Sequence, residues 1–368
     1  MPVELPQELT DAIIDHLSDD PHSLLSCSLV CRAFVFRCRF HLFATCRLTA
    51  SNIFEFCCLL RSPACTFIPH VRSIHASRQQ WHRDDRWFNE IALDLRRLLG
   101  VRELDMTLRI VSTSNANAYF RTGFVTSFSS VTHLVLSCNF TSPAPLVDMI
   151  CLFPALQDLH IRALSGTLAD PINVAVPPKE LHDLTLSTNS VSPLLAWLYA
   201  YNHLPKVDAL SLPPVRPNNA TTLRTALKRL GGSLRHLNVS LTWYLGVSDV
   251  DPSTVFNLAL HPNLETLAIR DYASRRGGVP QEVYKSHHMI LLIMRLAAPA
   301  LRHFELKLDD LLLYRAFDWA ALDAFLSSEQ RFPCLRSVVV PCRPAVDERL
   351  FLRGAMPLLQ ASGLLLLT

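Results

Sequence analysis

Glycine and lysine are both scarce in this sequence, and each shortage has a consequence. Only 10 of the 368 residues are glycine, and neither Gly-x-Gly-x-x-Gly nor Gly-x-x-x-x-Gly-Lys occurs. A nucleotide site built on a glycine-rich phosphate loop is therefore not expected. The lysines are Lys179, Lys206, Lys228, Lys285 and Lys307, and the remaining basic residues of the 35 are arginine. A general preference for arginine, whose planar fork suits carboxylates and interfaces, accounts for the imbalance.

The sequence also lacks a long apolar run and a strong excess of one charge. Its most apolar stretch, residues 289–298, is interrupted by Arg295 and is about half as long as a bilayer requires. No charged-then-apolar leader opens the chain, and the net charge is only +3. We therefore expect no membrane span, no secretory leader and no nucleic-acid partner. With 49% hydrophobic residues, the chain can form a sizeable core.

The eleven cysteines do not form the pattern of a disulfide framework or a metal site. Their number is odd and their spacing irregular, which indicates reduced thiols in an intracellular protein of the cytoplasm, the nucleus or both. Cys27, Cys31, Cys38 and His41 lie close in sequence, but their apolar neighbours favour buried thiols over zinc ligands. No Gly-x-Ser-x-Gly elbow is present. We predict no cofactor, no metal and no catalytic residue.

Residues 5–43 are the most distinctive stretch. Leu9, Ile13 and Leu17 follow one another at helical spacing, and acidic residues crowd the first turns, where the helix dipole favours them. Asp20 and Pro21 interrupt the pattern, and a second apolar run extends over residues 24–36. The stretch predicts two or three short helices, which are too few to bury a sufficient core without another surface.

This stretch resembles the F-box, and in particular that of fungal-type F-box proteins. The matching segments are Leu5-Pro6-x-Glu8-Leu9, Ile13-Ile14-x-x-Leu17, Leu24-Leu25-x-x-Ser28-Leu29-Val30-Cys31-Arg32-x-Phe34 and Leu42-Phe43. In that family the module docks onto the Skp-type adaptor of SCF ubiquitin ligases, and through it reaches the cullin and RING subunits. The resemblance implies an F-box over residues 1–48. It also implies an adaptor-facing surface formed by Leu5, Pro6, Leu9, Ile13, Leu25, Val30 and Cys31.

A short pattern recurs after this stretch: leucine or a substitute, two residues, leucine, one residue, leucine. Successive copies begin 25 to 37 residues apart, a spacing typical of solenoids whose units bury their apolar faces by stacking. The alternation at the end of each copy predicts a short strand, and the strands should form a parallel ladder. The copies begin at Val71, Val101, Val131, Leu156, Leu181, Val207, Leu234, Leu264, Leu301 and Leu335.

Helical patterns lie between the copies. Residues 53–60 predict one helix, and residues 194–201, 223–230 and 255–260 predict three more behind Ser192-Pro193, Thr221-Thr222 and Asp251-Pro252. Gly231-Gly232 is a natural helix stop, and residues 364–367 predict a last edge strand. Each unit is therefore expected to contain a helix, a turn and a strand.

The copies resemble leucine-rich repeats, although few ladder asparagines are present. The resemblance implies an α/β fold in which the helical F-box precedes an irregular solenoid over residues 49–368, with parallel strands and with helices on the convex side. Outward strand residues would then line a protein-binding surface, because they are polar without a strong excess of one charge. The candidate substrate-binding residues are His160, Arg162, Arg270 and Lys307.

The sequence thus predicts a substrate-recognition subunit of an SCF-type ubiquitin ligase that is not itself an enzyme. Its partners would be the adaptor, with cullin and RING subunits beyond it, and an unidentified substrate protein. A chain held beside a ubiquitin-transferring enzyme would also be modified less if it had few lysines. Two alternatives remain: a leucine-rich-repeat scaffold acting outside any ligase, and an enzyme with a pocket in the repeats.

Overall fold

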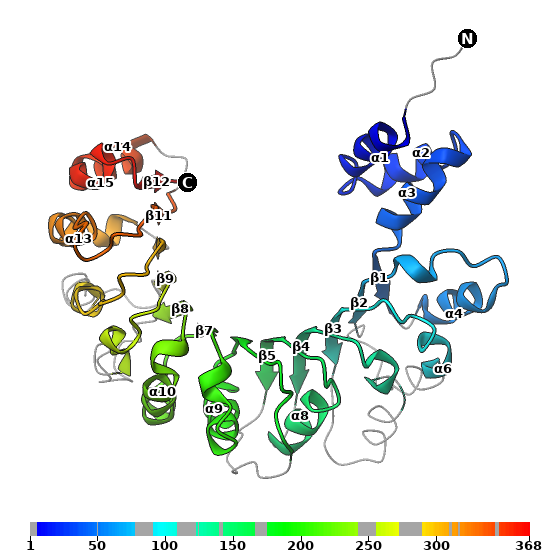
Figure 1. Ribbon diagram of the computed structural model, residues 1–368, viewed down its shortest axis with the longest axis horizontal. Coiled ribbons are helices and arrows are strands. Elements are labelled where there is room, and N and C mark those ends of the chain that lie inside the picture. Colours follow the sequence, from blue (N-terminus) through cyan, green and yellow to red (C-terminus); the bar gives the residue numbers. More distant parts are fainter. Residues whose placement is uncertain are drawn as a thin grey trace. The chain divides into compact units, whose positions relative to one another are not determined.

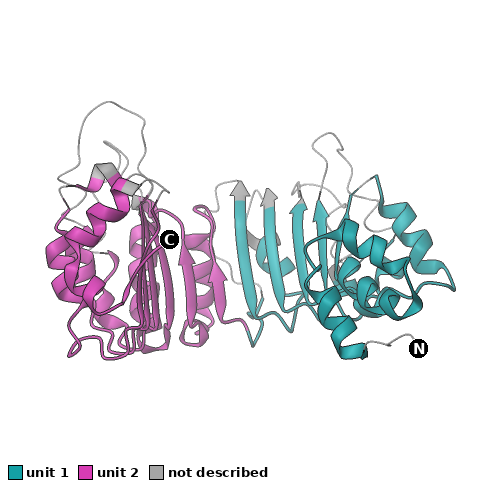
Figure 2. Ribbon diagram, turned by 90° about the horizontal axis from the view of Figure 1, so that it is seen from above, with its two compact units in different colours: residues 1–167, 174–180 teal, residues 168–173, 181–368 magenta. Residues whose placement is uncertain are grey.

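The computed structural model describes residues 6–49, 51–77, 91–108, 123, 125–139, 143–165, 175–241, 255–271, 289–308, 311–315, 317–342 and 346–368. The chain divides into two compact units. Unit 1 comprises residues 1–167 and 174–180, and unit 2 comprises residues 168–173 and 181–368 (Figure 2). Both units combine parallel strands with helices, so the α/β class predicted from the sequence is confirmed.

Unit 1 begins with three short helices, α1 (Gln7–Asp15), α2 (Pro21–Ser28) and α3 (Arg32–Leu42). The start of α2 is fixed by the Asp20 side chain, which accepts hydrogen bonds from the backbone N–H groups of His22 and Ser23 at 3.1 Å. Pro21 takes the first helical position, where no N–H is needed. The apolar run over residues 24–36 is therefore divided between two helices by the turn at residues 29–31.

The strands of unit 1 are parallel and follow one another in chain order. They are β1 (Thr45–Leu48), β2 (Ser73–Ser77), β3 (Glu103–Leu108), β4 (His133–Asn139) and β5 (Asp158–Ser165). Helices α4 (Ile53–Arg61), α6 (Ala92–Leu95) and α8 (Pro143–Ile150) lie on the same face of this sheet (Figure 1). Two 3₁₀ turns, η1 (Ile68–His70) and η2 (Val125–Phe128), complete the unit in the described residues. Strand β1 was not predicted, whereas α4 was.

Unit 2 continues the same scheme. Its described strands are β6 (Asp183–Thr185), β7 (Ala209–Leu212), β8 (His236–Leu241), β9 (Thr266–Asp271), β10 (His303–Leu308), β11 (Ser337–Val340) and β12 (Leu365–Leu367). Its helices include α9 (Val191–Ala200), α10 (Pro217–Leu230), α13 (Trp319–Leu326), α14 (Val346–Ala355) and α15 (Pro357–Ala361), and the described residues 289–294 are helical as well. The 3₁₀ turns are η3 (Leu204–Lys206), η4 (Gly231–Ser233), η5 (Leu258–Leu260) and η6 (Leu311–Tyr314). All ten repeat copies contain a strand, and β12 is the predicted last strand.

Three helix predictions in unit 2 need correction. Helix α9 begins at Val191, so Ser192 and Pro193 lie inside its first turn and do not precede it. Helix α10 begins at Pro217 and not behind Thr221-Thr222, because a proline at the first position pre-sets the helical backbone one turn earlier. The predicted helix over residues 255–260 is a 3₁₀ turn at its end, and its predicted start at Asp251-Pro252 lies outside the described residues. The helix stop at Gly231 is confirmed, since that residue has φ of +48°, which glycine adopts without strain.

The core of each unit is a stack of equivalent side chains. In unit 1, Ile74, Leu104, Leu134 and Leu159 occupy one row of the strand register and are all buried. In unit 2 the corresponding row is longer. Its members are Leu184, Leu210, Leu237, Leu267, Phe304, Val338 and Leu365, and they are buried as well. Because each side chain packs against the same position of the next repeat, no repeat can bury its own row alone.

The turns before the strands share one backbone arrangement in place of an asparagine ladder. The carbonyl of Arg72 accepts hydrogen bonds from the N–H groups of Arg102 and Glu103, at 2.8 and 3.1 Å. The carbonyl of Arg102 accepts in the same way from Thr132 and His133. Carbonyls with two such donors recur at Ala44, Thr132, His182, Asp208, Arg235, Glu265 and Arg302. One carbonyl thus satisfies two consecutive donors of the next repeat, which is how most turns manage without asparagine.

Candidate interaction surfaces

The three N-terminal helices are held together by a small core. Ile14, Leu24 and Cys38 are its buried members, one from each helix, and Leu17, Cys27, Phe34 and Leu42 pack around them partly exposed. This cluster fixes which faces of α1 and α2 point inward. On α1 the buried side chains are Thr10 and Ile14, so Leu9 and Ile13 face outward on the same helix.

An ion-paired triad fastens α1 to α3. Arg37 donates from Nε and Nη2 to the two carboxylate oxygens of Asp15, at 2.5 and 2.6 Å, and His41 Nε2 lies 2.7 Å from Asp15 Oδ1. The hydrogen bonds from Arg37 and His41 hold the pKa of Asp15 well below its usual range. The two helices are therefore fixed side by side, and their outward faces present one surface.

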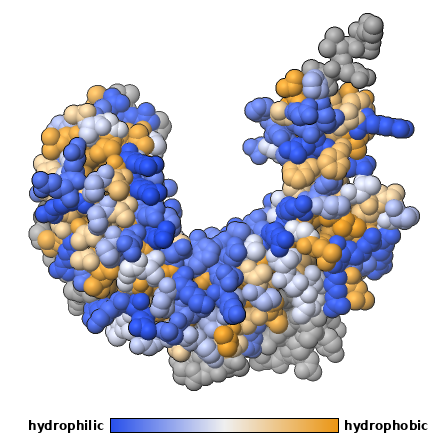
Figure 3. Space-filling view, in the orientation of Figure 1, coloured by the Kyte–Doolittle hydropathy of each residue, from blue (hydrophilic) through white to orange (hydrophobic). Residues whose placement is uncertain are grey.

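Apolar side chains cover part of that surface. Leu9, Ile13 and Leu25 are each more than half exposed, while Leu29 and Val30, in the turn between α2 and α3, are 87% and 70% exposed. Pro6 and Cys31 are exposed too. Apolar surface interrupts the polar surface of this part of the molecule in Figure 3. Six of the seven predicted adaptor-facing residues thus lie at the surface, and Leu5 lies outside the described residues.

Leu29 is the most exposed large apolar side chain among the described residues, yet it was not among the predicted site residues. The sequence places it between two leucine-containing helices, where a buried position would have been the simplest expectation. Its neighbours Val30 and Cys31 are exposed in the same turn. We therefore define the apolar patch of unit 1 as Leu9, Ile13, Leu25, Leu29 and Val30.

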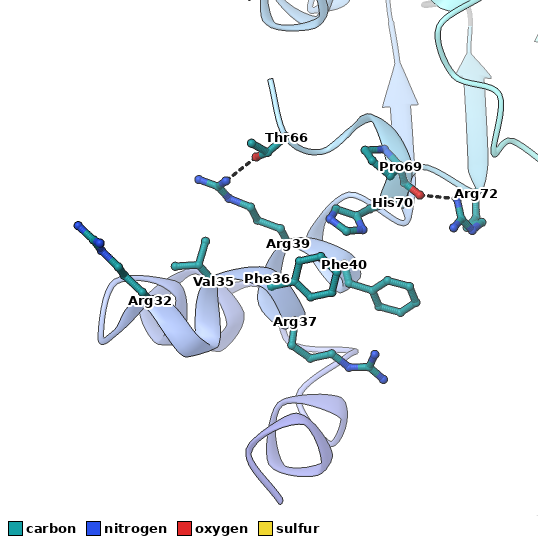
Figure 4. A pocket seen from close by; sticks show the side chains of 10 residues that line it. All are labelled: Arg32, Val35, Phe36, Arg37, Arg39, Phe40, Thr66, Pro69, His70 and Arg72. Carbon is teal, nitrogen blue, oxygen red and sulfur yellow. Dashed lines mark hydrogen bonds between the residues drawn. The ribbon is translucent and has the colours of Figure 1, made fainter. Parts of the chain in front are cut away.

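A groove that the sequence did not reveal lies between α3 and η1. Its volume is about 610 Å³, and the close view in Figure 4 shows its side chains. Phe36, Phe40 and His70 meet edge to face, with ring centroids of the two phenylalanines 5.0 and 6.0 Å from that of His70. We call this the arginine groove, since four arginines line it and no acidic residue does. Its lining comprises Arg32, Val35, Phe36, Arg37, Arg39, Phe40, Thr66, Pro69, His70 and Arg72.

The four arginines differ in how far they are already engaged. Arg37 is paired with Asp15, as described above. Arg39 donates to Thr66 Oγ1, and Arg72 donates to the carbonyls of Pro69 and Val71 at 2.7 and 3.2 Å. Burial and the neighbouring charges of Arg72 and Arg39 lower the pKa of His70, so its ring is neutral at pH 7 and adds no charge. The groove is therefore positive because of its arginines alone.

The predicted substrate-binding residues of unit 1 lie at a bulge. The pairing of β4 and β5 shifts by one residue after Leu136, so Arg162 has no directly opposite partner on β4. Its Nη1 donates to Asp105 Oδ2 at 2.8 Å, and His75 Nδ1 lies 3.2 Å from the same oxygen. Strand alternation would place Asp105 on the outward side of β3, yet its side chain is buried. His160 is half-buried, and burial lowers its pKa.

In unit 2 the two predicted residues are neighbours. Arg270 on β9 is aligned with Lys307 on β10, and Ser240 on β8 is aligned with Arg270 from the other side. Lys307 is exposed and Arg270 is half-buried. The strand register thus brings Arg270 and Lys307 together, whereas His160 and Arg162 lie two residues apart on the single strand β5.

Three thiols in the described residues are held in their unreactive, protonated form. Burial raises the pKa of Cys46, Cys57 and Cys151 to about 11, which keeps them protonated at pH 7. In the described ranges, no group of three or more histidine, cysteine or acidic side chains is arranged to hold a metal ion. None of the helices in those ranges has the length and apolar composition needed to cross a membrane.

Comparisons with known proteins leave the family of the chain open. No protein-family model matches the sequence, and no curated protein matches it. Among solved structures, a crystal structure of a protein from Bacteroides fragilis is 12% identical, with a TM-score of 0.18. That match covers 87% of this chain, and the chain spans 57% of the length of the Bacteroides protein.

Proposed function

We propose that the chain is the substrate-recognition subunit of an SCF-type E3 ubiquitin ligase. In this proposal residues 1–48 are an F-box that docks onto a Skp-type adaptor, and residues 49–368 are an irregular leucine-rich-repeat solenoid that binds a target protein. The observation that carries the proposal is the apolar patch. A small helical module leaves five large apolar side chains in water. Four of them, Leu9, Ile13, Leu25 and Val30, are residues that the F-box resemblance assigns to the adaptor-facing surface.

The patch is energetically sufficient for specific docking. Fully burying a leucine, isoleucine or valine side chain stabilises a complex by about 1.5 to 3 kcal/mol, and more than half of each patch side chain remains to be buried. Five such residues would contribute several kcal/mol before the cost of association is subtracted. The triad of Asp15, Arg37 and His41 supports this use, because it presents α1 in a fixed orientation and so limits the ordering cost.

The repeats support the receptor half of the proposal by their architecture. Within each unit the outward strand residues stand in rows, and the helices lie on the opposite face (Figure 1). Such rows offer an extended surface for a protein partner. The candidate substrate contacts are His160 and Arg162 in unit 1, and Arg270 and Lys307 in unit 2. The chain would perform no chemistry itself and would raise the rate of ubiquitin transfer by proximity.

The proposal is tested by co-purification. Tagged full-length chain, expressed in fungal cells, should capture the Skp-type adaptor, the cullin and the RING subunit in comparable amounts. Capture of the adaptor without the cullin would favour the alternative function, a leucine-rich-repeat scaffold acting outside any ligase. Failure to capture the adaptor would contradict the F-box assignment.

A further inference from the structure

The arginine groove is separate from the apolar patch, since none of the patch residues lines it. Its floor consists of Val35, Phe36, Phe40, Pro69 and His70, and Phe36 is largely exposed. Arginine side chains border this floor, and Figure 4 shows Arg32 and Arg72 at opposite ends of the view. The groove thus combines an apolar surface with positive charge at its margin, which is a composition suited to binding and not only to packing.

Most of the positive charge of the groove is not compensated locally. Helix α3 contains Arg32, Arg37, Arg39 and His41 but no acidic residue. Of the arginines, Arg37 is neutralised by Asp15, whereas Arg39 and Arg72 bond to uncharged oxygens and keep their charge. Arg32 forms no ion pair within the described residues, and arginine stays charged at any physiological pH.

We infer that the groove binds an acidic segment of a partner protein, in which an apolar side chain is flanked by carboxylates. Arg32 and Arg39 are seven residues apart on one helix face, which places their Cα atoms about 10 Å apart. Two carboxylates four residues apart in an extended segment lie on one face, about 13 Å apart, and the long side chains of the two arginines can reach both. The side chain between them then rests against Phe36. Recognition of acidic motifs by clustered arginines is a recurrent mode of peptide binding.

A small anion or a nucleic acid fits these observations less well. Inorganic phosphate would use the arginines but leave the apolar floor, including the exposed Phe36, in contact with water. A nucleic acid needs a longer basic track, whereas the whole chain has a net charge of only +3. The acidic segment uses both the charge and the apolar floor.

The test measures fluorescence anisotropy of labelled peptides with the full-length chain. The probe is a dodecapeptide with one phenylalanine midway between two aspartates that are four residues apart, so that all three side chains lie on one face of the extended peptide. One matched peptide replaces both aspartates with asparagine, and the other replaces phenylalanine with serine. The probe should bind with a micromolar Kd that weakens as NaCl rises from 50 to 300 mM, and both matched peptides should bind at least fivefold more weakly.

Variants of the chain locate the binding. Arg32→Glu should raise the Kd of the probe three- to tenfold, and the double variant Arg32→Glu with Arg39→Glu should raise it more than tenfold. The single variant should keep the melting temperature of the unchanged chain. The double variant Arg349→Glu with Arg353→Glu, on the exposed face of α14, is the matched control and should change Kd less than twofold. Equal binding of the asparagine peptide, equal loss in the control, or no binding at 1 mM chain would each overturn the inference. A different result would assign the groove to a simple anion: 10 mM phosphate displaces the probe, and the serine peptide binds as tightly as the probe.

Discussion

Truncating Leu29 and Val30 to alanine should abolish tight adaptor binding without disturbing the fold. Both side chains lie in the turn between α2 and α3 and are 87% and 70% exposed, so they contribute little to the folding stability of the free chain. If the adaptor covers the turn, almost the whole of each side chain becomes buried only in the complex. The double variant therefore separates binding from folding more cleanly than a change at a half-buried position would.

The size of the effect follows from these exposures. Fully burying a leucine or valine side chain contributes about 1.5 to 3 kcal/mol, and the alanine substitution retains only the Cβ share of that. With most of each side chain still to be buried, the two truncations together should cost about 3 kcal/mol. That corresponds to roughly a hundredfold increase in Kd.

Isothermal titration calorimetry of the full-length chain with a recombinant Skp-type adaptor measures this directly. The matched control is Leu93→Ala with Leu99→Ala, because these leucines of unit 1 are 73% and 78% exposed and lie outside the helical module. The control should bind like the unchanged chain, and both double variants should keep its melting temperature within about 2 °C. A less than threefold change in the Kd of the Leu29 and Val30 variant would refute the argument that this turn is the docking surface.

Three further outcomes are expected. Leu237→Ala should lower the free energy of unfolding by about 2 to 5 kcal/mol in urea titrations, because it opens a cavity in the buried row of unit 2, and a loss below 1 kcal/mol would contradict that packing. Burial lowers the pKa of His203 and His261 below 6.5, so on acidification these histidines take up protons in the unfolded chain before they do in the folded chain. Stability should therefore fall as pH drops from about 6.5 to 5. Replacing both with glutamine should make the melting temperature depend less on pH over that window. The lowered pKa of Asp15 affects stability at lower pH: its stabilisation is present above about pH 4 and is lost on acidification below it. Asp15→Asn should therefore reduce the pH dependence of the melting temperature below pH 4 and leave that dependence at pH 5 to 7 unchanged.

The strands were the most predictable part of the fold, for a physical reason. In each copy, such as the one beginning at Leu264, the apolar residues must recur at fixed places because they stack on equivalent residues of the neighbouring repeat. Strand β1 escaped prediction because Thr45-Cys46-Arg47-Leu48 is short and its inward residues are a cysteine and one leucine. Helix starts were less predictable, since Pro217 and Thr221 are both acceptable openings and only packing selects between them.

The interaction surfaces were predictable only where one local segment forms them. Helical spacing alone places Leu9 and Ile13 together, and the motif placed Val30 and Cys31 near them. The arginine groove needs Arg32 and Phe36 on α3 to meet His70 more than thirty residues later, and no local pattern pairs those segments. Likewise, the alternation of β3 predicts an outward Asp105, but its burial depends on Arg162, which a bulge two strands away directs toward it.

The carbonyls that accept two hydrogen bonds at the strand entrances have a consequence for how the chain tolerates change. Because that junction is made from main-chain atoms, it does not itself require a particular side chain, and alanine, arginine, threonine, histidine, aspartate and glutamate all occur there. The segment joining one junction to the next can also differ in length, as the spacing of 25 to 37 residues illustrates. Lengthening a connection or exchanging an entrance residue should therefore alter what the surface recognises while leaving the stack intact.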